Sequence, residues 1–266
     1  MSQMEREMPT VVLVVGYEGS GFAGFQIQPG VRTVQGCLEE ALRTVLDRDL
    51  RLSCAGRTDA GVHALGQVVS FPADPSEVDL EKLRDSLNGL TGDDICIRAA
   101  RWAVPGFSAR HHALSRTYLY RVRADRVPPV LSAPLVWWVK RPLDTAAMAE
   151  GASHLVGEHD FTSFCVAASA QGHDVRREVL AVDVFGHDVA GEECIGLRVK
   201  GRSFLHSMVR AIAGTLVEVG RGRRRPDWVR EVLAARDRAA AGMTAPARGL
   251  VLESVEYADD VWLDRA

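Results

Sequence analysis

Residues 54–71 read CAGRTDAGVHALGQVVSF. This stretch places the consecutive residues Arg57, Thr58 and Asp59 between Gly56 and Gly61, directly before an apolar run typical of a strand. The interior of a strand does not tolerate such a polar interruption, and an ordinary surface turn needs no cation and anion two residues apart. We therefore predict a glycine-hinged loop at the end of a sheet, with the aspartate directed out of the core.

Outward from this loop, the spacing of apolar residues predicts elements in the order βαββαβ, which is the order of a ferredoxin-like unit. The second half of the chain repeats the order more loosely. We predict an α+β fold of two ferredoxin-like halves with largely antiparallel sheets around a central cleft. Residues 1–105 are expected to carry the aspartate loop, and residues 106–266 to complete the active-site cleft. The predicted strands are 10–17, 51–55, 66–71, 94–102, 116–123, 135–140, 177–185, 193–200 and 250–257, and the predicted helices are 33–46, 79–90, 144–156, 203–219 and one that starts near Pro226.

Composition places the chain in the ordinary globular class, with 47% hydrophobic and 25% charged residues. The N-terminal sequence lacks the apolar segment of a signal peptide, and no apolar run reaches the length of a membrane span. The five cysteines are scattered without a CxxC pair, which argues against a disulfide framework and against a zinc site. We expect a soluble, cytoplasmic protein that holds no metal.

Basic residues are clustered, although the net charge is −3. Seven arginines lie between Arg98 and Arg126 against one acidic residue, and residues 221–225 read RGRRR. The guanidinium group is planar and suits phosphate oxygens, so such clusters can form a local anion-binding face on an acidic protein. The pattern favours a nucleic-acid partner.

Asp59 is the candidate for chemistry in the loop. An aspartate beside Arg57 is expected to stay ionised at neutral pH, which suits a nucleophile or an electrostatic stabiliser rather than a general acid. The simpler alternative is an Asx turn, in which the carboxylate binds backbone amides. For a motif as short as RTD, the turn is the more frequent outcome.

The longer motif AGRTDAGVHALGQVVSF resembles the signature of the TruA family of tRNA pseudouridine synthases. Further stretches resemble the same family in the same order, so that the resemblance extends from about Val11 to Tyr257. These stretches are YEGSGFAGFQIQ (17–28), GFSARHHALSRTYLYRV (106–122), GEHDFTSF (157–164), FLHSMVRAIAGTLVEVG (204–220) and APARGLVLESVEY (245–257).

The resemblance implies roles for particular residues. Asp59 matches the catalytic aspartate, and Arg57 matches an arginine that helps to hold the displaced nucleotide. Tyr118 matches a tyrosine that lies against the target uracil. Arg210 matches an arginine that pairs with the aspartate, and Leu250 matches an apolar residue that lines the pocket.

The resemblance also implies the reaction and the partners. Members of the family convert uridine to pseudouridine at positions 38, 39 and 40 of the tRNA anticodon stem-loop, use neither a metal nor an organic cofactor, and form homodimers. The sequence departs mildly from the family in the glycine-rich segment 16–30, where Phe25 replaces the usual tryptophan and Glu18 the usual aspartate. This segment lacks the spacing of a P-loop or a dinucleotide site, and we expect it to contact RNA.

The residue pattern is compatible with these roles. Tyr118 and Tyr120 fall on one face of the predicted strand, where a ring either packs in the core or stacks on a flipped base. Arg210 lies about 200° around the predicted helix from Met208, away from its apolar stripe of Phe204, Met208, Ile212 and Leu216.

Three questions stay open at this level. Asp59 could add to C1′ of the ribose, add to the uracil ring or remove a proton from C2′. A non-catalytic tRNA-binding or chaperone protein could use the same basic surface. A hydrolase with an aspartate nucleophile would need an acid or base beside it, and His63 is the nearby candidate.

Overall fold

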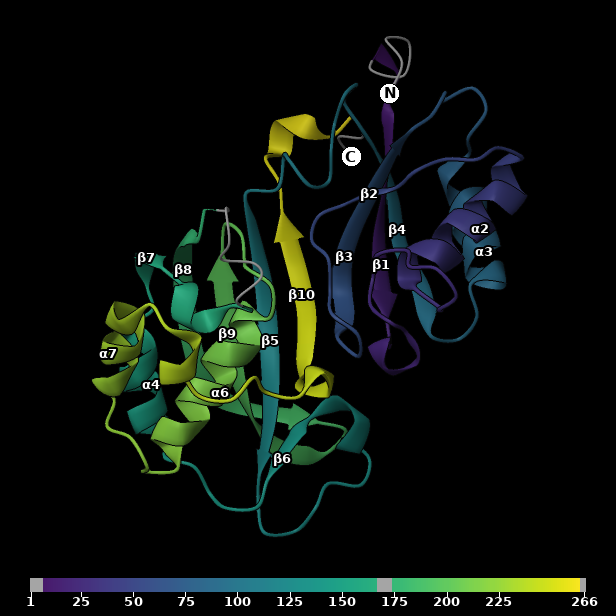
Figure 1. Ribbon diagram of the computed structural model, residues 1–266. Helices are drawn as coiled ribbons and strands as arrows, with labels where there is room; N and C mark the ends of the chain where they lie inside the picture. The colour runs from purple at the N-terminus through teal and green to yellow at the C-terminus, as the bar shows by residue number, and fades with distance from the viewer. Residues whose placement is uncertain (1–6, 167–173, 264–266) are drawn as a thin grey trace. The chain divides into compact units, whose positions relative to one another are not determined.

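The computed structural model describes residues 7–166 and 174–263 and shows a mixed α+β fold whose strands are mostly antiparallel. The chain forms two compact units (Figure 1). The first unit comprises residues 1–114 and 252–266, and the second comprises residues 115–251. Strand β10 (Leu250–Glu256) begins in the second unit and continues in the first.

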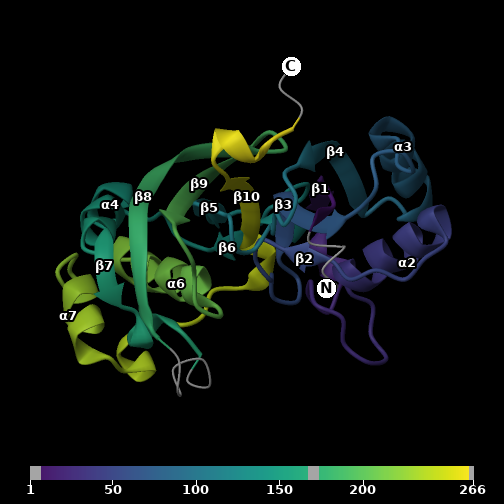
Figure 2. The same ribbon diagram turned by 90° about the horizontal axis from the view of Figure 1, so that it is seen from above.

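The first unit is built around β1 (Thr10–Tyr17), which is buried along nearly its whole length. It pairs antiparallel with β3 (His63–Pro72) on one side and β4 (Ile95–Ala103) on the other. The short strand β2 (Ser53–Cys54) pairs with β3. Helices α2 (Val34–Leu46) and α3 (Leu80–Leu90) lie side by side next to this sheet (Figures 1 and 2).

Both helices begin at residues whose side chains cap them. Thr33 Oγ1 accepts a hydrogen bond from the Gly36 N–H at the start of α2. Asp79 accepts hydrogen bonds from Glu81 and Lys82 at the start of α3. The side chain thereby satisfies N–H groups that have no partner inside the helix. These caps and the apolar spacing agree with the helices predicted at 33–46 and 79–90.

The second unit contains a sheet in the order β5 (Ser115–Ala124), β9 (Glu192–Gly201), β8 (Arg176–Val189) and β7 (Gly157–Asp160), with all neighbours antiparallel. The short strand β6 (Trp137–Val139) pairs parallel to β5. Helix α4 (Thr145–Ser153) contacts both α6 (Met208–Gly220) and α7 (Trp228–Ala235), as Figure 1 shows.

Helix α6 differs from its prediction in two respects. It begins at Met208 rather than near residue 203, because Ser207 has a left-handed backbone (φ 59°) that a continuous helix cannot contain. The predicted stripe residues Met208, Ile212 and Leu216 are buried, but Phe204 precedes the helix, and residues on the other sides of the helix are buried as well. The backbone around Met243 crosses the helix so closely that a Cβ on Gly214 would lie 1.8 Å from the Met243 carbonyl oxygen.

Most other predicted elements are confirmed, with changes at their ends. The strand predicted at 51–55 is reduced to β2, and the strand at 135–140 is reduced to β6. Strand β7 was not predicted, because Gly157–Asp160 is polar and lacks an apolar alternation. Among residues 7–166 and 174–263, the helices are too short or too polar to span a bilayer.

Candidate active site

The Asp59 loop joins β2 to β3 in the first unit. Its turn is closed by a hydrogen bond from the Val62 N–H to the Asp59 carbonyl oxygen (3.1 Å), and Gly61 supplies the positive φ of 76°. Thr58 is buried, whereas Asp59 is half-buried and Arg57 is exposed. The middle residue of the RTD motif therefore anchors the loop, and its two charged neighbours are accessible to a ligand.

Two buried polar residues hold the loop from the side of the core. The hydroxyl groups of Tyr17 and Thr58 lie 2.7 Å apart, and Gln67 Nε2 donates to the Gly56 carbonyl oxygen at 2.7 Å. Both Tyr17 and Gln67 are buried, and burial raises the pKa of Tyr17 well above its ordinary value. The tyrosine therefore stays protonated at neutral pH and remains a hydrogen-bonding group. Neither residue was singled out from the sequence, although a glutamine in an apolar strand is a detectable signal.

The glycine-rich segment after β1 packs directly on the Asp59 loop. The Phe25 N–H donates to the Thr58 carbonyl oxygen (3.1 Å), and a Cβ on Gly24, whose φ is 97°, would lie 3.0 Å from that oxygen. A Cβ on Gly19 would lie 2.1 Å from the Val62 carbonyl oxygen. At these positions the glycines permit close backbone approach.

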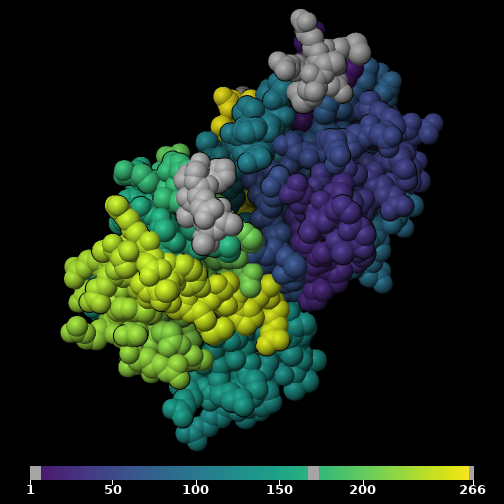
Figure 3. Space-filling model, viewed as in Figure 1, coloured from purple at the N-terminus to yellow at the C-terminus, as the bar shows by residue number. Residues whose placement is uncertain are grey.

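The expectation that this segment contacts RNA needs refinement. Phe25 is 1% exposed, and its ring centroid lies 6.4 Å from that of Tyr17, so its substitution for tryptophan is a change in the core. Residues 26–32 are exposed. In Figure 3 the purple atoms belong to the N-terminal part of the chain, which includes this segment, and they lie on the surface in that view.

His63, the acid or base that the hydrolase alternative would need, is buried. Its ring is 3% exposed, and its Nδ1 accepts a hydrogen bond from the Gly19 N–H at 3.0 Å. A general base needs a nitrogen that can reach the proton it removes, and here one ring nitrogen joins the glycine-rich segment to β3. The contact therefore gives His63 a structural role.

Tyr118 and Tyr120 share a face of β5 but have different surroundings. The rings of Tyr118 and Phe204 form a T-shaped pair, with centroids 5.2 Å apart and planes at 89°. Tyr120 is fully buried, and its hydroxyl donates to the Pro246 carbonyl oxygen at 2.8 Å. A Cβ on Gly249 would lie 2.7 Å from the Tyr120 ring. Both tyrosines are buried, Tyr120 completely and Tyr118 with 7% of its surface exposed.

Arg210 lies near the start of α6 and is half-buried. Its Nε donates to the Ala245 carbonyl oxygen at 2.8 Å, and the Ala245 N–H donates to the Arg210 carbonyl oxygen at 3.1 Å. The first of these hydrogen bonds ties the guanidinium group of Arg210 to the backbone at Ala245. Leu250, five residues later, begins β10 and is buried.

The segment 245–250 thus connects several predicted residues within the second unit. It binds Arg210 through Ala245, binds Tyr120 through Pro246, and continues into Leu250. Arg57 and Asp59 belong to the first unit. Tyr118, Arg210 and Leu250 belong to the second unit.

The arginines between Arg98 and Arg126 do not form a single phosphate-binding face. Arg116 and Arg121 are buried, and Arg116 Nη1 donates to the Arg202 carbonyl oxygen at 2.6 Å. Burial lowers the pKa of Arg121. Arg123 pairs with Asp125 at 2.7 Å. Sequence clustering overstated the number of available cations because it cannot distinguish structural arginines from exposed ones.

The five cysteines are free thiols, and burial raises the pKa of the Cys165 and Cys194 thiols. Within the described ranges, 7–166 and 174–263, no three His, Cys, Asp or Glu side chains are grouped as ligands of one metal ion would be.

Comparison with known proteins identifies the family. The family model described as tRNA pseudouridine synthase matches residues 13–104 and 152–258. Curated relatives named tRNA pseudouridine synthase A are 41% identical in Myxococcus xanthus (95% of this chain, 93% of the relative), 43% in Brevibacillus brevis (92% and 98%) and 44% in Methylobacterium nodulans (94% and 96%). A solved Cbf5-Nop10-Gar1 complex matches at 11% identity and a TM-score of 0.36, over 91% of this chain and 57% of that chain, which is too weak to argue from. The family model and the relatives together cover most of the sequence, and the chain belongs to the family of tRNA pseudouridine synthases.

Proposed function

We propose that this chain is an isomerase that converts uridine to pseudouridine in tRNA. The observation that carries the proposal is its identity of 41–44% to relatives named tRNA pseudouridine synthase A over more than nine-tenths of the chain. We further propose that the target uridines are at positions 38, 39 and 40 of the anticodon stem-loop, that the protein acts as a homodimer, and that it works in the cytoplasm. The free cysteines are compatible with that reducing compartment.

The reaction conserves every atom of the nucleoside. The bond from ribose C1′ to uracil N1 breaks, a bond from C1′ to C5 forms, the C5 proton leaves and N1 gains a proton. There is no net oxidation or reduction. The chemistry needs an anion near the sugar or base and contacts that hold the detached uracil while it turns. We assign the anion to Asp59, whether it adds to C1′, adds to the ring or removes a proton from C2′.

We assign substrate binding to the other four predicted residues. Arg57 is exposed and suited to the displaced nucleotide, whose phosphate it can contact. Tyr118 presents a ring on which a flipped base can stack. Arg210, oriented by Ala245, supplies a cation to pair with the aspartate, and Leu250 supplies an apolar surface for the base.

We also propose that both parts of the chain are ferredoxin-like and that both supply the site. Residues 1–105 contribute the aspartate loop, and residues 106–266 contribute the residues that hold the base. The strand order β4-β1-β3, with β2 paired to β3, supports this for the first part.

The test is to incubate the protein with unmodified tRNA and map pseudouridine. The wild-type protein should form product without added metal or cofactor. Asp59→Asn should bind tRNA with an unchanged Kd and form no product under single-turnover conditions. Asp85→Asn, at an exposed aspartate on α3, is the matched control and should remain active.

Two outcomes would contradict the proposal. If the wild-type protein binds tRNA tightly but forms no pseudouridine, the non-catalytic alternative is correct. Substantial turnover by Asp59→Asn would show that another group performs the chemistry.

A further inference from the structure

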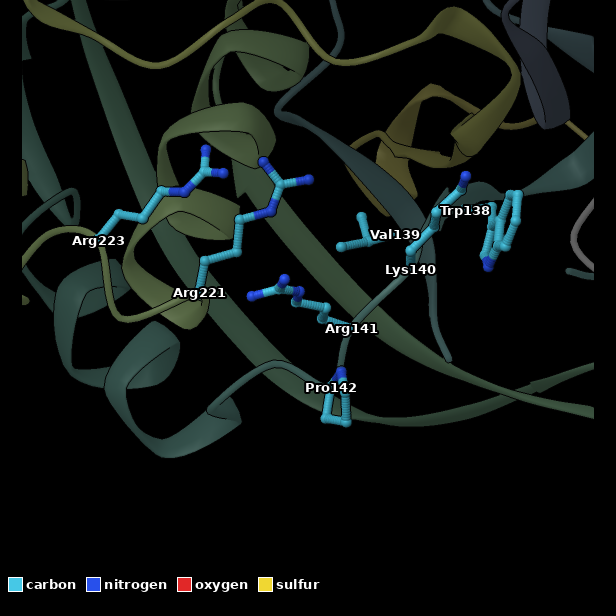
Figure 4. A pocket seen from close by; sticks show the side chains of 7 residues that line it. All are labelled: Trp138, Val139, Lys140, Arg141, Pro142, Arg221 and Arg223. Atoms are coloured by element: carbon cyan, nitrogen blue, oxygen red, sulfur yellow. The ribbon is translucent and has the colours of Figure 1, made fainter. Parts of the chain in front are cut away.

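A cationic pocket of about 390 Å³ lies in the second unit, and its lining includes none of the five predicted site residues. One wall is the segment that follows β6, and the other is the turn that follows α6 (Figure 4). Four of its lining residues carry positive charge. The lining residues are Trp138, Val139, Lys140, Arg141, Pro142, Arg221 and Arg223.

The cations on the α6 side share one carboxylate. Arg221 Nη1 lies 2.7 Å from Glu218, and Arg223 Nη1 lies 3.2 Å from the same side chain. The guanidinium group of Arg221 also lies over the ring of Trp137, 5.9 Å from its centroid. One carboxylate therefore orients two guanidinium groups without neutralising both of them.

The cations on the β6 side have no acidic partner among the residues that the structure describes. Lys140 Nζ lies 5.2 Å from the centroid of the Trp138 ring, and Trp138 is itself fixed by a hydrogen bond from Nε1 to the Asp125 carbonyl oxygen. Arg141 forms no ion pair or hydrogen bond within residues 7–166 and 174–263, and Figure 4 shows it extending toward the side of the pocket where Arg221 lies. An excess of positive charge therefore remains in the pocket.

The carboxyl end of α6 does not cancel this charge. Helix ends of this kind carry partial negative charge on their unpaired carbonyl oxygens. Here the last four carbonyl oxygens all accept hydrogen bonds from backbone N–H groups. The donor–acceptor pairs are Arg221–Val217, Arg223–Glu218, Gly222–Val219 and Asp144–Gly220. The helix end is therefore satisfied by backbone N–H groups, and the side chains of Arg221 and Arg223 pair with Glu218.

We propose that this pocket binds a phosphate group of the tRNA backbone other than the phosphate of the target uridine. The inference rests on the proposed function, which supplies RNA as the ligand. Guanidinium groups bind phosphate oxygens through paired N–H donors, and converging cations are stabilised by a bound anion. The volume is ample for a phosphate with its adjoining sugar.

The test is the salt dependence of tRNA binding by the double variant Lys140→Gln/Arg141→Gln. These two side chains are exposed and lack an acidic partner in the described structure, so their replacement should leave folding intact. Loss of one or two phosphate contacts should reduce the slope of log Kobs against log salt by about 1–2 and weaken binding about tenfold at moderate salt. Arg230→Gln, an exposed cation on α7 paired with Asp227, should change neither quantity.

Kinetics separate this inference from the proposed function. The double variant should show a raised KM for tRNA and an unchanged kcat, because a contact to a phosphate other than that of the target uridine affects binding rather than chemistry. If the wild-type protein makes no pseudouridine, the proposed function fails, and the salt slopes still report on the pocket. If the wild type is active and the double variant has wild-type KM and salt slope, the pocket assignment is wrong.

Inorganic phosphate and pyrophosphate distinguish the sources of the anion. We expect both to compete weakly with tRNA for the wild-type protein and less for the double variant. If the variant loses pyrophosphate binding but binds tRNA with the wild-type salt slope, the pocket serves a free phosphate compound, and its assignment to RNA is overturned.

Discussion

The hydroxyl groups of Tyr17 and Thr58 lie 2.7 Å apart, although 41 positions separate these residues in the chain. The bond joins the end of β1 to the centre of the RTD motif. It fixes the threonine in the core, while Asp59 remains half-exposed and Arg57 exposed. The position of the candidate catalytic carboxylate thus depends on a buried hydroxyl pair that takes no part in the chemistry.

Tyr17→Phe should therefore impair turnover more than binding. Removing the phenol leaves a buried threonine hydroxyl short of a partner, which costs about 1–2 kcal/mol of unfolding free energy. We expect a lower kcat with an unchanged Kd for tRNA, measured by single-turnover kinetics and urea unfolding. Tyr257→Phe is the control, because its hydroxyl donates to the Ala109 carbonyl oxygen in the same unit. Equal loss of kcat in both variants would show a general stability effect.

Gly24→Ala and Gly30→Ala separate close packing from backbone strain. Both glycines have positive φ, but a Cβ on Gly24 would lie 3.0 Å from the Thr58 carbonyl oxygen, whereas a Cβ on Gly30 would meet nothing within 4 Å. Each alanine costs about 1 kcal/mol through strain. Gly24→Ala should in addition displace the Asp59 loop and lower kcat at least tenfold, which corresponds to about 1.4 kcal/mol in the activation free energy. Similar kcat values for the two variants would contradict the proposed contact between loops.

Tyr118→Phe and Tyr120→Phe should affect different properties. Tyr120 is fully buried and donates to the Pro246 carbonyl oxygen, so its replacement should lower the unfolding free energy by about 1–2 kcal/mol and change activity little. Tyr118→Phe keeps a ring for stacking, whereas Tyr118→Ala removes it. We expect only the alanine variant to lose most of its turnover. Full activity of Tyr118→Ala would remove this residue from the site.

The ion pair between Arg32 and Asp94 should give a pH-dependent contribution to stability. Arg32 Nη2 donates to Asp94 at 2.9 Å, and this hydrogen bond holds the pKa of Asp94 below its ordinary value. A carboxylate whose pKa is lowered by folding stabilises the native state above the unfolded pKa of about 3.9, and this stabilisation is lost as the pH falls through the lower folded pKa. Asp94→Asn should therefore be less stable than wild type at pH 7, with a difference that shrinks below about pH 4.

Arg32→Gln provides the check on that interpretation. It removes the other partner, so its effect at pH 7 should overlap with that of Asp94→Asn in a double-mutant cycle rather than add to it. Thermal or urea unfolding at pH 7 and pH 3 measures both quantities. Additive effects, or a difference that is independent of pH, would assign the stability to another contact.

The sequence by itself determined the order of the elements and the identity of the loop. Apolar spacing is a local property, so the helices predicted at 33–46 and 79–90 agree with α2 and α3 to within one residue at each end. The motif around Asp59 identified the family because its residues are contiguous. In contrast, the start of α6 could not be read from its pattern, since a left-handed Ser207 interrupts an otherwise apolar helical spacing.

Tertiary structure decided which polar residues support the loop and which cations are available. Tyr17, Gln67 and Gly24 act on the Asp59 loop through contacts between segments distant in sequence, which no local pattern encodes. The arginine-rich sequence suggested many phosphate ligands. Burial removed Arg116 and Arg121 from that set, whereas Arg141 and Arg221 line one pocket, because solvent exposure and proximity are properties of the folded chain.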